Sequence, residues 1–481
     1  MKKKFLSNLI LLVFLNLLIK PFWFFGIDIT VQNRVGEVDY GFYASLFGFA
    51  FMMNILLDLG ITNFNNRRIS QDHSYLNPGL SKIIPLKFLL SLVYGIIVFL
   101  TAWLIGYDSV QIKLLVVLVL NQFIASFILY LRSNISGLQL FRTDSLLSVL
   151  DRTLMIILTG ILLWSNILKQ PFKIEWFVYT QTISYTLTCI IILLVVRYHS
   201  GKIRMSFNLT EMKSLLKMSY PFALLILLMS FFNRADSVMI ERLLPDDGKF
   251  QTGVYFQSYR LLDAFSQFSL LFAGLLLPMF SKMLKTGEKI DELVQIAISL
   301  LLTVSITVAV ISYFFNVNLI SLFYHDAVDS SPKVFRILMI GYIGISVSYV
   351  YGTLLTANKN LKQLNIIAII TVVINIVLNL ILIPKFKAIG AAIASLSAQG
   401  FFAITQVIVS HKLFNLKMKK LFIPRVILFT IIVICTSYLT LLKLDWILSL
   451  LIVAFISIAA AIITRLIRPK EIIEILRGSA E

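Results

Sequence analysis

Two stretches decide the fold of this chain: Met218–Leu244, MSYPFALLILLMSFFNRADSVMIERLL, and Gly253–Phe280, GVYFQSYRLLDAFSQFSLLFAGLLLPMF. Each is apolar and long enough to cross a bilayer as a helix, which takes about 20 residues. The first nevertheless contains Arg234 and the second contains Arg260, each with an acidic residue close by. Because a charge within a span costs at least about 2.5–3.5 kcal/mol, such residues usually face a cavity or a partner. The pair is therefore predicted to open a second bundle of helices and to supply a functional site.

Composition places the whole chain in the membrane class. Of its 481 residues, 58% are hydrophobic and only 14% are charged, which is too little polar surface for a soluble fold. The apolar runs are continuous, whereas the strands of a membrane barrel would alternate. We predict an all-α polytopic protein with about 14 transmembrane helices. Their centres are expected near Phe14, Met52, Tyr94, Asn121, Ile156, Tyr185, Phe231, Gln267, Val304, Ile345, Ile374, Ala398, Ile432 and Phe455.

Basic residues in the predicted loops set the orientation. Most of the 43 Lys and Arg residues, including Lys82 and Lys87, fall in loops on the side of the N-terminus. Cytoplasmic loops carry such an excess, so both termini are predicted to be cytoplasmic. The apolar run after the first lysines resembles a signal peptide, but Lys20-Pro21 replaces a cleavage site and indicates an uncleaved first span. The net charge of +19 is scattered over the loops, so nucleic acid is not an expected partner.

A weak internal repeat divides the chain. The tripeptide GFY at 41–43 opens the second span, and GVY at 253–255 opens the eighth. Each half then has six spans with the same orientation, which predicts two parallel six-helix bundles related by an axis along the membrane normal. A substrate path between the bundles is expected, and the last two spans are appended. The predicted domains are residues 1–210, 211–415 and 416–481.

Motifs for cofactor or metal chemistry are missing from the sequence. It has no G-x-x-x-x-G-K-[ST], H-E-x-x-H or C-x-x-C pattern, and its two cysteines lie in apolar segments. The four histidines are dispersed along the chain: His73, His199, His325 and His411. We therefore expect no ATP hydrolysis, no metal site and no cofactor.

Four stretches carry a resemblance to a known family: RVGEVDYGFY at 34–43, LDLG at 57–60, NIVLNLILIP at 375–384 and IGAAIA at 389–394. Together they resemble the polysaccharide-transporter (O-antigen flippase) family of the MATE-like multidrug/oligosaccharidyl-lipid/polysaccharide exporter superfamily. The resemblance implies a MATE-like fold and a flippase of the bacterial plasma membrane that works by alternating access. Its implied substrate is a polyprenyl-pyrophosphate-linked oligosaccharide, such as an O-antigen, capsule or exopolysaccharide repeat unit. The implied partners are membrane lipid and the glycan polymerase and glycosyltransferases of the same pathway.

Charges within the spans give the candidate site. At about 1.5 Å per helical residue, Lys20 lies roughly 22 Å from the inner edge of the membrane core, and Arg234 and Arg260 lie roughly 20 Å from it. We expect these three to bind the pyrophosphate of the lipid-linked glycan, because a guanidinium makes paired hydrogen bonds to phosphate oxygens. Asp236 and Asp263 are expected as ion-pair partners of the arginines or as ligands of a coupling ion. Lys20 is also close enough to the outer edge to extend into the headgroups.

Two amides and two alternative functions complete the prediction. Asn375 and Asn379 lie one turn apart, where they can contact sugar hydroxyls or, as asparagines in spans more commonly do, bond neighbouring helices. A drug or metabolite antiporter of the same superfamily is the first alternative, and it needs an acidic pocket. A membrane glycan polymerase, ligase or glycosyltransferase is the second. The longest expected outside loops, 27–40 and 316–333, are short, so the protein is not predicted to be an enzyme.

Overall fold

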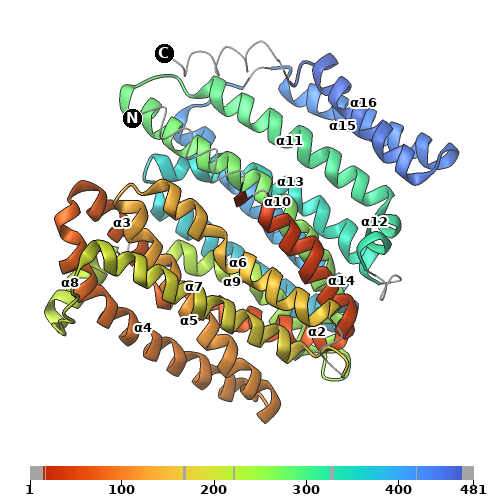
Figure 1. Cartoon of the computed structure of the whole chain (residues 1–481). Coiled ribbons are helices and arrows are strands. Elements are labelled where there is room, and N and C mark those ends of the chain that lie inside the picture. Colours follow the sequence, from red (N-terminus) through yellow and green to blue (C-terminus); the bar gives the residue numbers. More distant parts are fainter. Residues whose placement is uncertain are drawn as a thin grey trace. The chain divides into compact units, whose positions relative to one another are not determined.

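The computed structural model describes residues 15–16, 18–165, 170–219, 223–324, 330–418 and 420–467. The regular elements among these residues are all helices, and none of the residues lies in a strand (Figure 1). Nine helices in the described ranges are long and apolar enough to cross a membrane. The prediction of an all-α polytopic membrane protein is therefore confirmed.

The chain forms two compact units, residues Met1–Glu241 and Arg242–Glu481. In the first unit the elements are η1 (Phe22–Asp28, a π-helix), α2 (Ile29–Met52), η2 (Asn54–Leu57, a 3-10 helix), α3 (Ile61–Gln71), η3 (His73–Tyr75), α4 (Leu76–Ile105), α5 (Ser109–Gly137), α6 (Phe141–Trp164), α7 (Ile174–Ser200), α8 (Leu209–Ser219) and α9 (Ala223–Leu243), which runs past the boundary. In the second they are α10 (Gly248–Thr286), α11 (Asp291–Phe314), α12 (Asn316–Phe323), α13 (Ser331–Ala357), α14 (Leu361–Phe414), α15 (Phe422–Lys443) and α16 (Trp446–Ile463).

The order of the helices follows the predicted spans. Every expected centre from Tyr94 onward falls within a helix, and the two central stretches become α9 and α10. The expected centre at Phe14 lies outside the described residues. The predicted division at residue 210 separates sequence repeats and stays a prediction, whereas the compact units divide after Glu241, so that most of α9 belongs to the first unit.

The expected outside loop at 27–40 is shorter than predicted. Residues on both sides of Gly36 are helical, from η1 through α2, and Gly36 itself breaks the helix with φ 80° and ψ 170°. Glycine suits this position because it has no Cβ to clash at positive φ. Asp28 and Glu37 are buried, and the Tyr40 hydroxyl donates to Asp28 Oδ1 at 3.0 Å across the break. Helix α2 ends at Met52, the residue where we expected the centre of the second span.

A comparable break divides α14 into the predicted eleventh and twelfth spans. Lys387 has φ 53° and ψ −135°, and its Nζ lies 2.6 Å from Asp247 Oδ2. The amide of Ala388 donates to Gln251 Oε1 at 3.3 Å. These contacts hold the break against the first turns of α10. Gly390 follows, where an added Cβ would lie 2.3 Å from the carbonyl oxygen of Leu382.

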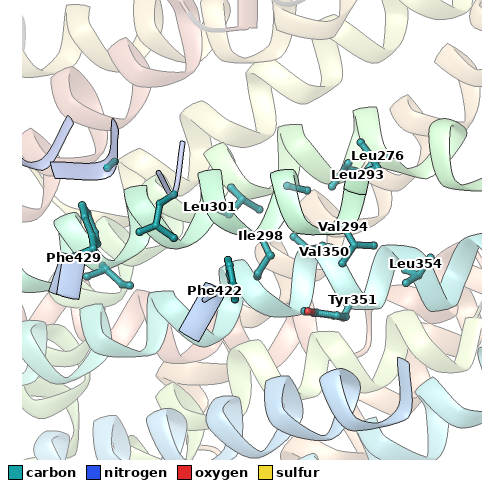
Figure 2. Packing of buried hydrophobic residues seen from close by; sticks show 14 of the residues in the cluster. Leu276, Leu293, Val294, Ile298, Leu301, Val350, Tyr351, Leu354, Phe422 and Phe429 are labelled. Carbon is teal, nitrogen blue, oxygen red and sulfur yellow. The ribbon is translucent and has the colours of Figure 1, made fainter. Parts of the chain in front are cut away.

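Each unit has its own apolar core. In the first, α3, α4, α5, α7 and α8 contribute residues such as Leu80, Leu131 and Leu215. In the second, Leu293, Ile298 and Leu301 of α11 pack with residues of α13 and with Phe422 and Phe429 of α15 (Figure 2). The last two helices are therefore part of the core of the second unit.

Candidate functional site

Arg234 is positioned by close packing of α9 on α2. The two helices meet at Gly48, where an added Cβ would lie 2.6 Å from Ser237 Oγ and 3.6 Å from the carbonyl oxygen of Arg234. The Ser237 hydroxyl in turn donates to that carbonyl at 2.9 Å. A residue without a side chain at position 48 thus lets α9 approach closely enough for Arg234 to reach across α2.

The guanidinium of Arg234 lies over an aromatic column on α2. Its central carbon is 5.2 Å from the ring centroid of Phe51 and 5.7 Å from that of Phe47. Tyr43, Phe47 and Phe51 stack at intervals of four residues, with ring centroids 5.8 and 5.9 Å apart. A cation over such faces is attracted to the ring quadrupoles by about 0.5–2 kcal/mol. The column lies beside the guanidinium, and Arg234 is half-buried. The spacing i, i+4, i+8 of these three aromatic residues is the sequence signal that could have revealed the column.

Lys20 is exposed and belongs to a separate basic cluster. It lies within electrostatic range of Arg152, Asp151 and Arg132. Arg152 pairs with Asp151 at 3.7 Å and lies over the ring of Trp23 at 5.4 Å. The exposure of Lys20 agrees with the interpretation that its side chain extends into the headgroup layer.

The acidic residues of α9 are buried. Asp236 is 2% exposed and Glu241 is 8% exposed. Glu241 Oε1 accepts from Gln111 Nε2 at 2.6 Å, and Gln111 forms a capping box with Asp108 at the start of α5. Sequence reasoning missed Glu241 because Gln111 and Glu241 are distant in the chain.

In the second unit, Arg260 also lies over an aromatic ring, but this ring belongs to its own helix. Its guanidinium carbon lies 4.8 Å from the ring centroid of Phe256, one turn earlier on α10. Asp263 is half-buried and lies within electrostatic range of Tyr349 on α13. Each unit therefore contains an arginine held over an aromatic ring on a long helix. The common depth of the two arginines stays a prediction.

Asn375 and Asn379 lie inside the second unit. They are 1% and 0% exposed, and Asn379 Nδ2 donates to Asn375 Oδ1 at 3.2 Å. This burial favours packing, the commoner use of asparagine in spans, over contact with sugar hydroxyls.

A buried ion pair went unnoticed in the sequence. Lys87, expected in a loop, lies within α4 and is 1% exposed. Its Nζ lies 2.5 Å from Asp58 Oδ1 and donates to the carbonyl oxygen of Leu57 at 2.9 Å and to Ser126 Oγ at 3.2 Å. Asp58 also accepts from the amide of Thr62 at 3.3 Å, at the first turn of α3. This network holds the short connection between α2 and α3 against α4 and α5.

We expect Asp58→Asn to destabilise the protein more than Lys87→Met does. Removing one partner of a buried pair costs about 3–5 kcal/mol because the other charge stays buried. Lys87 is 1% exposed and Asp58 is 23% exposed, so an unpaired Asp58 regains water more easily. The measurement is the temperature at which detergent-solubilised protein aggregates, with exposed Lys113→Met as control. The double variant K87M/D58N should recover much of the thermal stability that Asp58→Asn loses. Equal losses in Asp58→Asn, Lys87→Met and the double variant would contradict a specific pair.

Acidic, histidine and cysteine side chains do not gather into a metal site in the described residues. No group of three or more of them is placed to hold a metal ion there. The interactions at the candidate residues are those of guanidinium groups, aromatic faces and buried carboxylates.

Comparison with known families identifies the chain. A family model described as "Polysaccharide biosynthesis protein" matches residues 5–284, and a second model, MatE, matches residues 284–381. The chain belongs to the polysaccharide biosynthesis protein family. No curated protein matches this family member.

Solved structures share its fold. The lipid II flippase MurJ in an inward closed conformation has a TM-score of 0.69 at 17% identity, covering 96% of this chain and 100% of that one. A multidrug resistance MATE transporter of the MOP superfamily, inward-facing, has a TM-score of 0.65 at 16% identity over 80% of this chain and 92% of that one. A MOP superfamily transporter from Pyrococcus furiosus has a TM-score of 0.54 at 15% identity, covering 85% and 94%. The expected MATE-like fold of this polysaccharide biosynthesis family member is confirmed.

Proposed function

We propose that the protein is a flippase that moves a polyprenyl-pyrophosphate-linked oligosaccharide from the inner to the outer leaflet of the bacterial plasma membrane. The match of residues 5–284 to the polysaccharide biosynthesis family carries this proposal. The fold shared with MurJ and MATE transporters supports alternating access as its mechanism. The cytoplasmic location of both termini follows from the loop charges and belongs to the same proposal.

In this proposal Arg234 and Arg260 hold the pyrophosphate. A guanidinium is planar and presents its N–H groups as a fork. Such a fork can pair with two phosphate oxygens, and the neighbouring ring faces would help to orient it before the substrate arrives. Lys20, which is exposed, would attract the anionic headgroup toward the site. Asp236 and Asp263 would balance the arginines or bind a coupling ion when the substrate is absent.

The membrane potential assists the proposed direction. An anionic headgroup that moves outward across an inside-negative membrane gains about 2.3 kcal/mol per charge per 100 mV. The glycan polymerase and glycosyltransferases of the same pathway are the expected partners, since they would supply and consume the lipid-linked unit. The protein itself would break no covalent bond and act as a transporter only.

Buried acids in the first unit favour a second candidate function. Asp28, Glu37, Asp236 and Glu241 are each at most 8% exposed. An antiporter that exchanges organic cations for protons or sodium would use such carboxylates. Resistance to cationic drugs in cells that express the protein would support this function, and unchanged drug uptake together with lost glycan export in a deletion strain would exclude it.

Deleting the gene in its host is expected to trap lipid-linked oligosaccharide in the inner leaflet. The reason is that synthesis continues while the headgroup cannot cross the hydrocarbon core unaided. The measurement is mass spectrometry of extracted lipids, combined with protection of the glycan from a membrane-impermeant glycosidase. Single repeat units that the glycosidase can reach from outside would indicate a polymerase and overturn the proposal.

A further inference from the structure

A groove with one basic and one apolar wall lies in the first unit. It has a volume of about 510 Å³ and lies between α4, α5 and α7. Its apolar wall consists of side chains such as Phe88, Phe127 and Leu193. Its basic wall consists of Arg197, at the end of α7, and of two residues of the following segment, Lys202 and Arg204.

The segment that supplies the basic wall is anchored to α4. Asn77 Nδ2 donates to the carbonyl oxygens of Ser200 at 2.7 Å and Lys202 at 3.0 Å. The amide of Ser206 donates to the carbonyl oxygen of Ser81 at 2.9 Å. Between the two cations, Ile203 packs against the apolar core of the unit. Backbone bonds and a core contact thus present Lys202 and Arg204 along one edge of the groove.

Exposed apolar and aromatic side chains lie on the helices and the segment that line the groove. Phe88 on α4 is 47% exposed, and Leu194 on α7 is 60% exposed. Tyr198 and Phe207, at 85% and 78%, are large aromatic groups of the kind that occupies membrane interfaces. In a membrane, this surface would place the apolar wall against acyl chains and the basic wall at the level of the headgroups.

The basic wall has no acidic counterpart in the described part of the chain. No carboxylate there lies within 4.0 Å of Arg197, Lys202 or Arg204. Basic pockets between transmembrane helices bind anionic lipid headgroups. We propose that this groove is a binding site for an anionic glycerophospholipid, with its phosphate on the three cations and an acyl chain along Phe88 and Leu193.

The chemistry of the lining favours a membrane phospholipid over the lipid-linked glycan. All nine lining side chains are either apolar or basic. The groove thus offers no carboxylate, amide or hydroxyl side chain to a sugar, although sugar recognition depends on such groups. A bound phospholipid would hold the segment 197–208 on α4 and α7, and this site is independent of the proposed transport function.

The triple variant R197Q/K202Q/R204Q is expected to bind phosphatidylglycerol about 100-fold more weakly than the unmodified protein, because each interfacial Lys or Arg contributes about fivefold. The measurement is native mass spectrometry of the full-length protein in detergent, titrated with palmitoyl-oleoyl phosphatidylglycerol. Phosphatidylcholine serves as the uncharged reference, and its weaker binding should be unaffected. The matched control K359Q/K362Q/K412Q removes three exposed cations elsewhere and should retain the affinity for phosphatidylglycerol.

Two further titrations identify the source of the phosphate. Phe88→Ser should weaken binding of both phospholipids, because it shortens the apolar wall and leaves the cations in place. Soluble glycerol phosphate should not displace phosphatidylglycerol at equal concentration. Displacement by glycerol phosphate would overturn the proposed lipid site. The proposed lipid site would also be overturned if the triple variant and its control bound phosphatidylglycerol with equal affinity. Preferential binding of polyprenyl phosphate over phosphatidylglycerol by the unmodified protein would overturn it too.

Discussion

Arg234→Ala is expected to lower surface-glycan export roughly 10- to 100-fold. A charge-assisted hydrogen bond to a phosphate is worth about 1.5–3 kcal/mol, and alanine loses the whole fork. The structure adds a second reason: Phe47 and Phe51 orient the guanidinium, so its orientation costs little entropy when the substrate arrives. Export is measured as glycan on the cell surface per molecule of protein in the membrane.

Three variants separate binding from folding in this experiment. Arg234→Lys keeps the charge but lacks the planar fork, so we expect export between that of the unmodified protein and that of the alanine variant. Asn233→Ala changes the exposed neighbour on the same helix and should leave export unchanged. Arg260→Ala should reduce export as Arg234→Ala does, and the double variant should abolish it. Normal export by the double variant at normal membrane abundance would contradict the proposed site.

Gly390→Ala is expected to prevent accumulation of folded protein. A Cβ at this position would lie 2.3 Å from the carbonyl oxygen of Leu382 and 3.0 Å from the amide nitrogen of Ile383. Because both are backbone atoms of the opposing arm of α14, they cannot rotate away as a side chain would. The break at Lys387 would have to open, and overpacking that shifts the backbone costs about 1–3 kcal/mol or more.

The matched control for Gly390 lies on the same helix. At Gly400 an added Cβ meets no heavy atom within 4 Å, so Gly400→Ala should be tolerated and even favour the helix. Both variants are compared by size-exclusion chromatography of detergent extracts after heating. A Gly390→Ala variant with the same monodisperse peak and heat resistance as Gly400→Ala would show that the break in α14 relaxes freely.

The membrane fold was predictable because its cause is local. Hydrocarbon excludes unpaired backbone groups, so each long apolar run must form a helix, and the runs from Tyr94 onward do so in the expected order. The prediction from hydropathy was less accurate around Gly36. There we expected a loop at 27–40, whereas buried contacts such as that of the Tyr40 hydroxyl with Asp28 keep the chain helical on both sides of the break at Gly36. Local polarity does not reveal such partners.

The candidate site was predictable in part. The arginines stood out in the sequence because charge is rare in a span, and the structure places both over aromatic rings. The partner rings of Arg234 lie far away in the chain, on α2, and no local pattern connects them to it. The pair Lys87–Asp58 was hidden for the same reason, since each residue alone looked like part of a loop or a helix end.

The sequence by itself determined the order of the apolar helices from Tyr94 onward, the family and the presence of charges within the apolar stretches. Hydropathy and motif spacing carry that information, because both depend on residues that are neighbours in the chain. Only the tertiary structure decided which aromatic faces Arg234 contacts, that Lys87 is buried, and that Arg197, Lys202 and Arg204 line one groove. In Met218–Leu244, likewise, the charge of Arg234 can be read from the sequence, whereas its position depends on the approach of α9 to Gly48. These contacts depend on how closely the helices approach each other. Small residues and backbone breaks determine that approach, and they act between segments that are far apart in the chain.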